Sequence, residues 1–240
     1  MDVDISEPDV SPLQLQGPKS RDVLRAAFGD APTELKYYRF MEFDWDGVPL
    51  IISRTGWSSE LGYEIFLRDG TQGEKLWEHL MAVGGPLGLK PGHTSSIRRI
   101  EAGMLSYHAD MTLANNPYEM GMGRLVDLDM EADFISKAAL TLIKERGVSQ
   151  QLVGLEIDGA PFVGSNDFFW PVLKEGVKVG TVTSAIYSPR LQKNIALAMI
   201  SIDHTASGRV LQVDKLSETR ACTVVPIPFY DPKKSLATAS

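Results

Sequence analysis

The hydrophobic pattern begins with a strand and a helix. Residues 11–18, SPLQLQGP, alternate apolar and polar positions and stop at a Gly-Pro pair, which predicts a short strand followed by a turn. Residues 19–28 then place Val, Leu, Ala and Phe at helical spacing. Ser20 is a good N-cap residue and Gly29 a good terminator, so we expect the helix to lie between them.

A hairpin and a second helix follow. Residues 37–56 alternate on both sides of Asp46-Gly47, and an Asp-Gly pair between alternating segments is a strong signal for a tight β-turn. Residues 65–67 continue as a strand, and residues 71–84 have the apolar stripe of an amphipathic helix. That stripe consists of Leu76, Trp77, Leu80 and Met81. The order β-α-β-β-β-α predicts an α+β layer, in which a mixed sheet with ferredoxin-like elements is backed by helices.

The middle of the chain is less regular. Residues 95–105, SSIRRIEAGML, predict a short helix. Its inward residues are expected to be Ile97, Ile100 and Met104. Residues 115–133 are polar and rich in glycine, and we expect them to form a long connection. Residues 133–147 have the pattern of a helix that ends at Gly147. The expected apolar side of this helix consists of Phe134, Ile135, Ala138, Leu142 and Ile143.

From residue 151 onward the pattern changes to short strands separated by Gly, Asp and Pro turns. LVGLEIDG, NIALAMISID and RVLQVDK are examples. Regular spacing of this kind predicts a small all-β barrel or sandwich. The expected organisation is therefore an α+β domain over residues 1–114, a connecting segment with a helix over 115–150, and a C-terminal β-barrel domain over 151–240.

Composition narrows the class of protein. The 240 residues are 43% hydrophobic and 23% charged, as in an ordinary soluble globular protein, and are enough for one large domain or two smaller ones. The net charge of -7 argues against nucleic-acid binding as the main function. Cys222 is the only cysteine, so no disulfide can form within the chain, and a reducing compartment, the cytoplasm, is expected. The N-terminus does not resemble a signal peptide, and no apolar run of about 18 residues predicts a membrane span.

Residues 55–65, TGWSSELGYEI, carry more chemistry than a plain turn requires. A hairpin tip needs only Gly, Asn or Asp, but this stretch also holds Trp57, Glu60, Tyr63 and Glu64. A carboxylate accepts two parallel N–H bonds, and aromatic faces suit flat ligands. The stretch therefore predicts a binding surface for a flat ligand with a donor-bearing edge. The alternative is a solvated acidic turn.

A second candidate site lies around Arg98-Arg99 and Glu101. Adjacent arginines on a helix point in different directions, so one can face inward and would need a carboxylate from the protein or from a ligand. The alternative is two surface arginines with an ion pair inside the helix. Residues 107–110, YHAD, are weak evidence for a metal site. The sequence lacks HExxH, GxSxG, P-loop and GxGxxG motifs. It therefore has no signature motif of a zinc protease, a serine hydrolase, a nucleotide kinase or a Rossmann dehydrogenase.

A series of motifs resembles a known family. SRTGWSSELGYEI resembles S-R-T-G-[YW]-[TS]-x-E-x-G-[YF]-E-[IV], and RRIEAGMLSYHADM resembles R-[LI]-E-A-G-x-x-x-Y-G-x-[DE]. NNPYEMGMG, DFISKAAL, LVGLEIDG and VGTVTSAIYSPRLQKNIALAMI follow in the family's order, and VPIPFYDP resembles its usual last strand. The resemblance is to the tetrahydrofolate-dependent family of the glycine cleavage T-protein, or aminomethyltransferase, and it covers nearly the whole chain.

Within the family the likeness is closer to the dimethylsulfoniopropionate demethylase branch. Four stretches carry it: residues 96–103, 115–119, 151–159 and 188–195. The activity implied by this likeness is transfer of a methyl group from a sulfonium to tetrahydrofolate, which gives methylmercaptopropionate and 5-methyltetrahydrofolate. The sulfonium is already a good leaving group, so positioning and exclusion of water are the main demands on the protein, and no metal is implied.

The resemblance also implies roles for individual residues. Glu64 matches the glutamate that grips the amino-pyrimidinone edge of the pterin, and Trp57 matches an aromatic beside the folate. Arg99 matches an arginine that lines the folate or substrate site, and Tyr107 matches the next aromatic. Because a sulfonium is a cation without hydrogen-bond donors, the ring of Trp57 or Tyr107 is a suitable host for the substrate. The resemblance assigns no catalytic residue to this chain.

The chain also departs from the family pattern. The family's chain starts well upstream of Met1, and its N-terminal third contributes to the folate cavity and, in the aminomethyltransferases, supplies a catalytic aspartate. Ser96 stands in place of an acid, and His108 and Ser136 stand in place of glycines. Two alternatives follow: an aminomethyltransferase that acts with a lipoyl carrier protein, and a non-catalytic folate-binding fragment. The expected partners are a small-molecule substrate and, as one option, a second copy in a homodimer, with no nucleic acid and no membrane.

Overall fold

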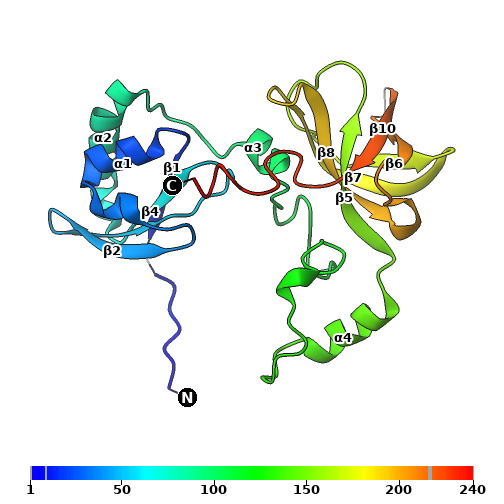
Figure 1. The fold of residues 1–240 in the computed structure, drawn as a ribbon, viewed down its shortest axis with the longest axis horizontal. Coiled ribbons are helices and arrows are strands. Elements are labelled where there is room, and N and C mark those ends of the chain that lie inside the picture. The colour runs from blue at the N-terminus through cyan, green and yellow to red at the C-terminus, as the bar shows by residue number, and fades with distance from the viewer. Residues whose placement is uncertain (1, 9, 216–217, 240) are drawn as a thin grey trace. The chain divides into compact units, whose positions relative to one another are not determined.

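The chain forms two compact units in the computed structural model, which describes residues 2–8, 10–215 and 218–239 (Figure 1). One unit comprises Met1–Ser95 with Lys233–Ser240, and the other comprises Ser96–Pro232. Each unit has buried hydrophobic clusters of its own. None of the helices in the described part of the chain is both long and apolar enough to cross a lipid bilayer.

The first unit is built on a four-stranded sheet with the strand order β1-β4-β3-β2. The strands are β1 (Ser11–Gln16), β2 (Phe40–Trp45), β3 (Val48–Ser53) and β4 (Gly62–Leu67). The predicted hairpin is confirmed, since Asp46 and Gly47 join β2 to β3 with φ angles of 50° and 81°, as a tight two-residue turn requires. The α+β class is confirmed as well, but the pairing within this sheet is antiparallel throughout, not mixed.

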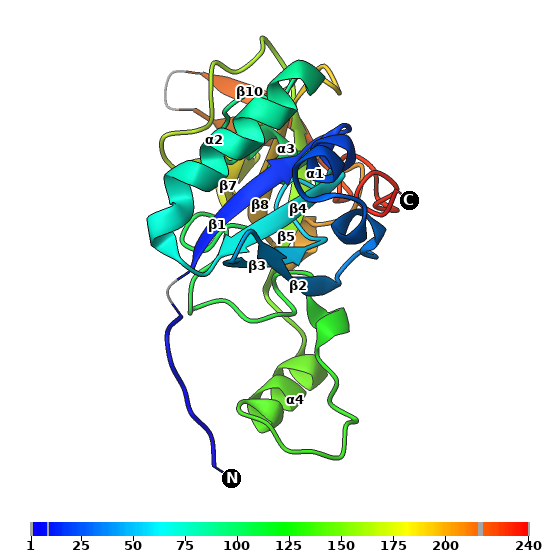
Figure 2. The same ribbon diagram turned by 90° about the vertical axis from the view of Figure 1, so that its left-hand side faces the viewer.

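Two helices pack on one face of this sheet, as Figure 2 shows. They are α1 (Ser20–Phe28) and α2 (Gly73–Gly84), with short 3₁₀ turns at Ala31–Glu34, Gly70–Gln72 and Gly85–Leu87. Gly29 ends α1 as predicted, but the cap position is Lys19, one residue before the expected Ser20. The predicted stripe of α2 is half correct: Leu76 and Leu80 are buried, whereas Trp77 is 42% exposed.

The second unit begins with α3 (Ser96–Glu101), a long connection with one 3₁₀ turn at Gly123–Leu125, and α4 (Lys137–Arg146). Gly147 ends α4 as predicted. The apolar side expected for this helix is not covered: α4 has no buried residue, and Ile135, which lies before the helix, is 95% exposed. An amphipathic pattern predicts a helix but not a partner for its apolar side.

The rest of the second unit is a closed six-stranded barrel with the strand order β10-β5-β8-β7-β6-β9 (Figure 1). Its strands are β5 (Gln150–Ile157), β6 (Trp170–Lys174), β7 (Val177–Ser188), β8 (Lys193–Ser201), β9 (Val210–Asp214) and β10 (Thr219–Val225), with a 3₁₀ turn at Ile202–His204. Side chains from every strand fill its interior. Closure removes the unpaired edges that an open sheet of short strands would expose, and it confirms the predicted barrel.

Candidate functional site

The motif SRTGWSSELGYE spans the end of β3, the loop that follows and the start of β4, and the side chain of Gln16 holds the loop in place. Gln16 Nε2 donates to the carbonyls of Tyr63 at 3.2 Å and Thr55 at 3.4 Å, and its Oε1 accepts from Ser58 Oγ at 2.6 Å. A Cβ atom at Gly56 or Gly62 would lie 2.3 Å from Gln16 Oε1. The two glycines of the motif therefore leave room for the amide that fixes the loop.

Arg54 and Tyr63 of the same motif belong to the interior. Arg54 is 2% exposed, donates to the carbonyls of Gly62 at 3.1 Å and Ala239 at 3.0 Å, and lies 5.1 Å from the centre of the Tyr63 ring. Burial lowers the pKa of the Arg54 guanidinium from its usual value. Tyr63 is fully buried, and its hydroxyl accepts from Arg21 Nε at 3.3 Å. Part of the motif is thus explained by packing alone.

Glu64 points away from the helices, because residues alternate along β4 and its neighbours Tyr63 and Ile65 are buried in the core. Gln14 on the adjacent strand donates to Glu64 Oε1 at 3.2 Å, and the hydroxyl of Thr55 donates to Oε2. Within the described residues no lysine or arginine forms an ion pair with Glu64. Its negative charge is therefore oriented by neutral donors and is not neutralised.

Glu64 lines a cavity of about 560 Å³ in the first unit. The other walls are residues 12–16 of β1, Phe66 of β4, three residues of α2 and the segment 89–94. The α2 residues are Trp77, Leu80 and Met81. This volume lies within the range of about 300–1,000 Å³ that is usual for small-molecule sites. The lining combines apolar side chains with polar groups, as a site for a small molecule requires.

Trp57 and Glu60 lie in the same loop as the buried Arg54, and both are partly buried. Each makes a polar or ring contact, so neither side chain is free in the loop. Neither belongs to the lining of the 560 Å³ cavity as the described residues define it. The assignment of Trp57 to a folate-binding surface stays a prediction.

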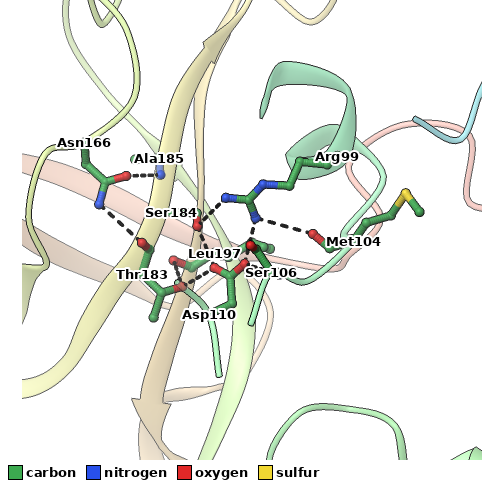
Figure 3. Close-up of polar contacts among 9 residues, drawn as sticks. All are labelled: Arg99, Met104, Ser106, Asp110, Asn166, Thr183, Ser184, Ala185 and Leu197. Carbon is green, nitrogen blue, oxygen red and sulfur yellow. Dashed lines mark hydrogen bonds and ion pairs between the residues drawn. The ribbon is translucent and has the colours of Figure 1, made fainter. Parts of the chain in front are cut away.

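The second unit contains a buried cluster around Arg99 and Asp110 (Figure 3). Arg99 Nη1 donates to Asp110 Oδ2 at 2.7 Å, and Nη2 donates to Ser184 Oγ at 2.8 Å. Asp110 also accepts from the hydroxyls of Ser184 at 2.6 Å and Thr183 at 2.7 Å, and from the Ser106 amide at 2.9 Å. The cluster fastens α3 to strand β7 of the barrel. An inward arginine was one of the two interpretations that the sequence allowed, but Asp110 was missed as its partner.

Arg99 and Ser184 also line a small cavity of about 180 Å³, whose other walls include Asn166, Phe168 and Thr183. The side-chain amide of Asn166 is hydrogen-bonded to the backbone, since its Oδ1 accepts from the Ala185 amide at 2.7 Å. Whether Arg99 contacts a ligand stays a prediction.

Arg98, next to Arg99 on α3, is more exposed and pairs with the buried Glu101. Arg98 Nη1 donates to Glu101 Oε2 at 3.1 Å, which is the ion pair within the helix that the sequence allowed. Glu101 is buried, and its Oε1 accepts from Ser188 Oγ at 2.5 Å while Arg190 Nη1 lies 3.7 Å from Oε2. Its carbonyl accepts from the amides of Phe229 and Tyr230. Three motifs, RRIEAG, SPRL and PIPFYD, therefore meet at one glutamate.

Tyr107 is 49% exposed, and its ring centre lies 4.2 Å from that of His108. His108 has a φ of 69°, and Ser136 has a φ of 74°. The left-handed region is costly for residues other than glycine. The two positions where the family pattern has glycine are thus positions where this chain needs a left-handed backbone.

Of the four predicted ligand residues, Glu64 and Trp57 belong to the first unit and Arg99 and Tyr107 to the second. Glu64 is the one that lines the large cavity. Sequence reasoning missed Gln14 and Gln16. Their signal was the alternation of β1, which places both on the same face as Glu64 once β1 pairs with β4.

Comparisons with known proteins agree with this fold. The chain is 38% identical over 223 residues to dimethylsulfoniopropionate demethylase DmdA of Ruegeria pomeroyi, a match that covers 93% of this chain and 60% of that protein. It is 35% identical over 232 residues to an aminomethyltransferase of Bacillus cereus, covering 94% of this chain and 62% of that protein. The chain thus spans about three fifths of the length of these relatives.

A solved structure resembles the fold. The crystal structure of glycine cleavage system aminomethyltransferase T from Bartonella henselae superposes with a TM-score of 0.79 at 23% sequence identity, over 93% of this chain and 60% of that one. The model of the GCVT N-terminal domain matches residues 1–130, and that of the glycine cleavage T-protein C-terminal barrel domain matches residues 150–231. These matches confirm the resemblance seen in the motifs, and the chain belongs to the glycine cleavage T-protein family.

Proposed function

We propose that this protein binds tetrahydrofolate and catalyses transfer of a one-carbon unit to it. The observation that carries the proposal is Glu64, a carboxylate that lines a 560 Å³ cavity in a chain of this family. Its two oxygens are oriented by Thr55 and Gln14, and no described cation neutralises them.

The chemistry of the cavity fits a pterin. An amino-pyrimidinone edge presents parallel N–H donors, which a carboxylate accepts in bidentate fashion. Gln14 and Gln16 add amide groups beside Glu64, and Phe66, on the same face of β4 as Glu64, supplies apolar surface for a flat ring. Glu64 would therefore hold the pterin edge, and the loop that Gln16 fixes would keep that carboxylate in place.

Tetrahydrofolate, when bound, supplies N5 as the acceptor of the carbon unit. The residues of this chain would bind and orient the acceptor and exclude water, which suits a reaction that depends on alignment of two reactants. Trp57 is proposed to lie beside the folate, and Trp57 or Tyr107 to face a sulfonium. Arg99 is proposed to line the folate or substrate site; its guanidinium already bonds Asp110 and Ser184, so it would act as a fixed wall.

Dimethylsulfoniopropionate is the proposed methyl donor. Support comes from the 38% identity with a protein named for that demethylation and from the motif likeness of residues 96–103 and 188–195. An aminomethyl group on a lipoyl carrier protein is the second candidate, supported by the 35% identity with an aminomethyltransferase. The cytoplasm and a homodimer remain expectations.

The first test is calorimetric titration of the 240-residue chain with tetrahydrofolate. Loss of the carboxylate in Glu64→Gln should weaken binding about tenfold or more, because hydrogen bonds to a charged group are worth roughly 1.5–3 kcal/mol. Glu42→Gln on strand β2, an exposed position outside the cavity lining, is the matched control and should bind normally. Equal affinity of the Glu64→Gln variant would refute the pterin assignment.

The second test separates the two donors. The chain with tetrahydrofolate is given either dimethylsulfoniopropionate or an aminomethylated lipoyl carrier protein. Formation of 5-methyltetrahydrofolate from the sulfonium would support the demethylase. Consumption of the carrier's aminomethyl group would support the aminomethyltransferase. Folate binding with neither product would support the non-catalytic alternative.

A further inference from the structure

The lining of the cavity that includes Glu64 also carries a positive charge. Among its described lining residues, Glu64 is the only acid and Lys90 is the only lysine or arginine, and His93 lies close to Lys90 in the sequence. Apolar side chains of Phe66, Leu80 and other residues complete the lining. The cavity therefore offers an acceptor, apolar surface and a cationic group within one volume.

Glu64 and Lys90 do not form an ion pair with each other in the described part of the chain. Glu64 is bonded by Thr55 and Gln14, and no ion pair joins it to Lys90 in the described part of the chain. Lys90 is exposed, and its ammonium can supply three donors to an anion. Opposite charges that share a cavity without pairing are complementary to a ligand that carries donors at one end and an anion at the other.

The backbone beside Lys90 is anchored to the end of α2. The amide of Leu89 donates to the Gly84 carbonyl at 2.9 Å at the end of α2. The side chain of Leu89 packs so closely on Gly84 that a Cβ there would lie 2.5 Å from Leu89 Cδ2. His93 Nδ1 lies 2.9 Å from the carbonyl oxygen of Thr94, which makes Nδ1 the donor. The segment that carries Lys90 and His93 is thus attached to the helix that forms a wall of the cavity.

We propose that Lys90, assisted by His93, is the carboxylate-binding end of this cavity and receives the glutamyl tail of the folate. The inference rests on the proposed function, and it adds a specificity: the site distinguishes a folate from a bare pterin. A folate has a donor-bearing pterin, a flat apolar linker and a glutamate, in that order, which matches the three kinds of lining.

The test compares three probes in calorimetric titrations: tetrahydrofolate, a tetrahydropterin without the tail, and N-(4-aminobenzoyl)-L-glutamate, the tail without the pterin. Lys90→Gln should weaken tetrahydrofolate about threefold and Lys90→Glu about tenfold, as expected for a partly exposed ion pair that is removed or reversed. The tetrahydropterin should bind all Lys90 variants equally. The tail fragment should lose affinity in the Lys90 variants and keep it in Glu64→Gln.

Lys178→Gln, an exposed lysine on β7 of the other unit, is the matched control and should change none of the three affinities. Added salt should reduce the difference between wild type and Lys90→Gln, because the contact is electrostatic. Unchanged tetrahydrofolate affinity in both Lys90 variants would overturn this inference and leave the proposed function standing. Equal weakening of tetrahydrofolate and the tetrahydropterin would also overturn it. Failure of the wild-type chain to bind any of the three probes would overturn both proposals.

Discussion

Removing the charge of Asp110 should be one of the most damaging isosteric changes in the second unit. The Asp110 side chain is fully buried, and that of its partner Arg99 is 9% exposed. Asp110→Asn keeps the shape but leaves the guanidinium without a counter-charge. Breaking one partner of a buried ion pair costs about 3–5 kcal/mol, which is a large share of the roughly 5–15 kcal/mol by which a domain is stable.

Urea unfolding followed by tryptophan fluorescence measures this cost, with a change in midpoint at constant slope as the sign of a pure stability effect. The exposed pair Arg25–Asp30 is the matched control, since its side chains are 47% and 81% exposed. Asp30→Asn should cost at most about 1 kcal/mol. A double-mutant cycle of Arg99→Met with Asp110→Asn should give a coupling of about 1–3 kcal/mol.

Two results would refute this reasoning. The first is a cost for Asp110→Asn no larger than that of Asp30→Asn, which would mean that water reaches the cluster. The second is strict additivity in the cycle, which would mean that Asp110 acts through Thr183 and Ser184 and not through the charge of Arg99.

Three further predictions concern packing, backbone strain and titration. Gly62→Ala should cost about 1–3 kcal/mol in urea unfolding, because its Cβ would meet the pinned Gln16 amide, and the cost should largely vanish when Gln16→Ala is also present. His108→Gly and Ser136→Gly should each raise the unfolding free energy by up to about 1 kcal/mol, since both residues have a left-handed backbone; a loss in both would contradict this. Burial raises the pKa of the Cys222 thiol from its ordinary 9.0 to about 12, so Ellman's reagent should react with it at pH 8 only after unfolding. Below about pH 9 the thiol is neutral in both states, so it leaves the free energy of unfolding unchanged. Between about pH 9 and 12 the unfolded protein loses this proton while the folded protein keeps it, so the free energy of unfolding falls as the pH rises, a contribution that Cys222→Ala should lack.

Local chemistry explains which parts of the fold could be predicted. Asp46-Gly47 allows the positive φ angles of the hairpin, and Gly29 and Gly147 end their helices because each takes a backbone conformation that other residues adopt at a cost. The barrel could be predicted because short strands separated by turns have few other ways to pair the backbone N–H and C=O groups at the edges of their sheet.

What could not be predicted depends on partners that are distant in the sequence. The amphipathic pattern of α4 indicated a helix, but nothing in the pattern says whether a surface covers its apolar side. Trp77 fits the helical period of α2, yet the core is completed by Leu76 and Leu80, and Trp77 is 42% exposed and lines the cavity. Helical periodicity indicates which side of a helix is buried, but it does not indicate how wide the buried stripe is.

The candidate site shows the same limit. Glu64 could be singled out in the sequence because aromatic residues lie near it. The donors that orient its carboxylate lie on β1 and in the loop before β4, and only the register between β1 and β4 identifies Gln14. An inward arginine at position 99 was one of two interpretations, and the choice depended on Asp110, eleven residues further along the chain.

The first unit is discontinuous along the chain, and this determines the order in which it can be completed during synthesis. Arg54 and the Ala239 carbonyl that it bonds are separated by 185 residues. At ribosomal speeds of about 5–20 residues per second, roughly 10–40 seconds pass between their emergence. During that interval the four strands and two helices are available to fold, but the guanidiniums of Arg21 and Arg54 lack the acceptor that they later share. A nascent chain, or a fragment that stops at residue 95, would therefore have the sheet of this unit without the acceptor that both arginines use in the 240-residue chain.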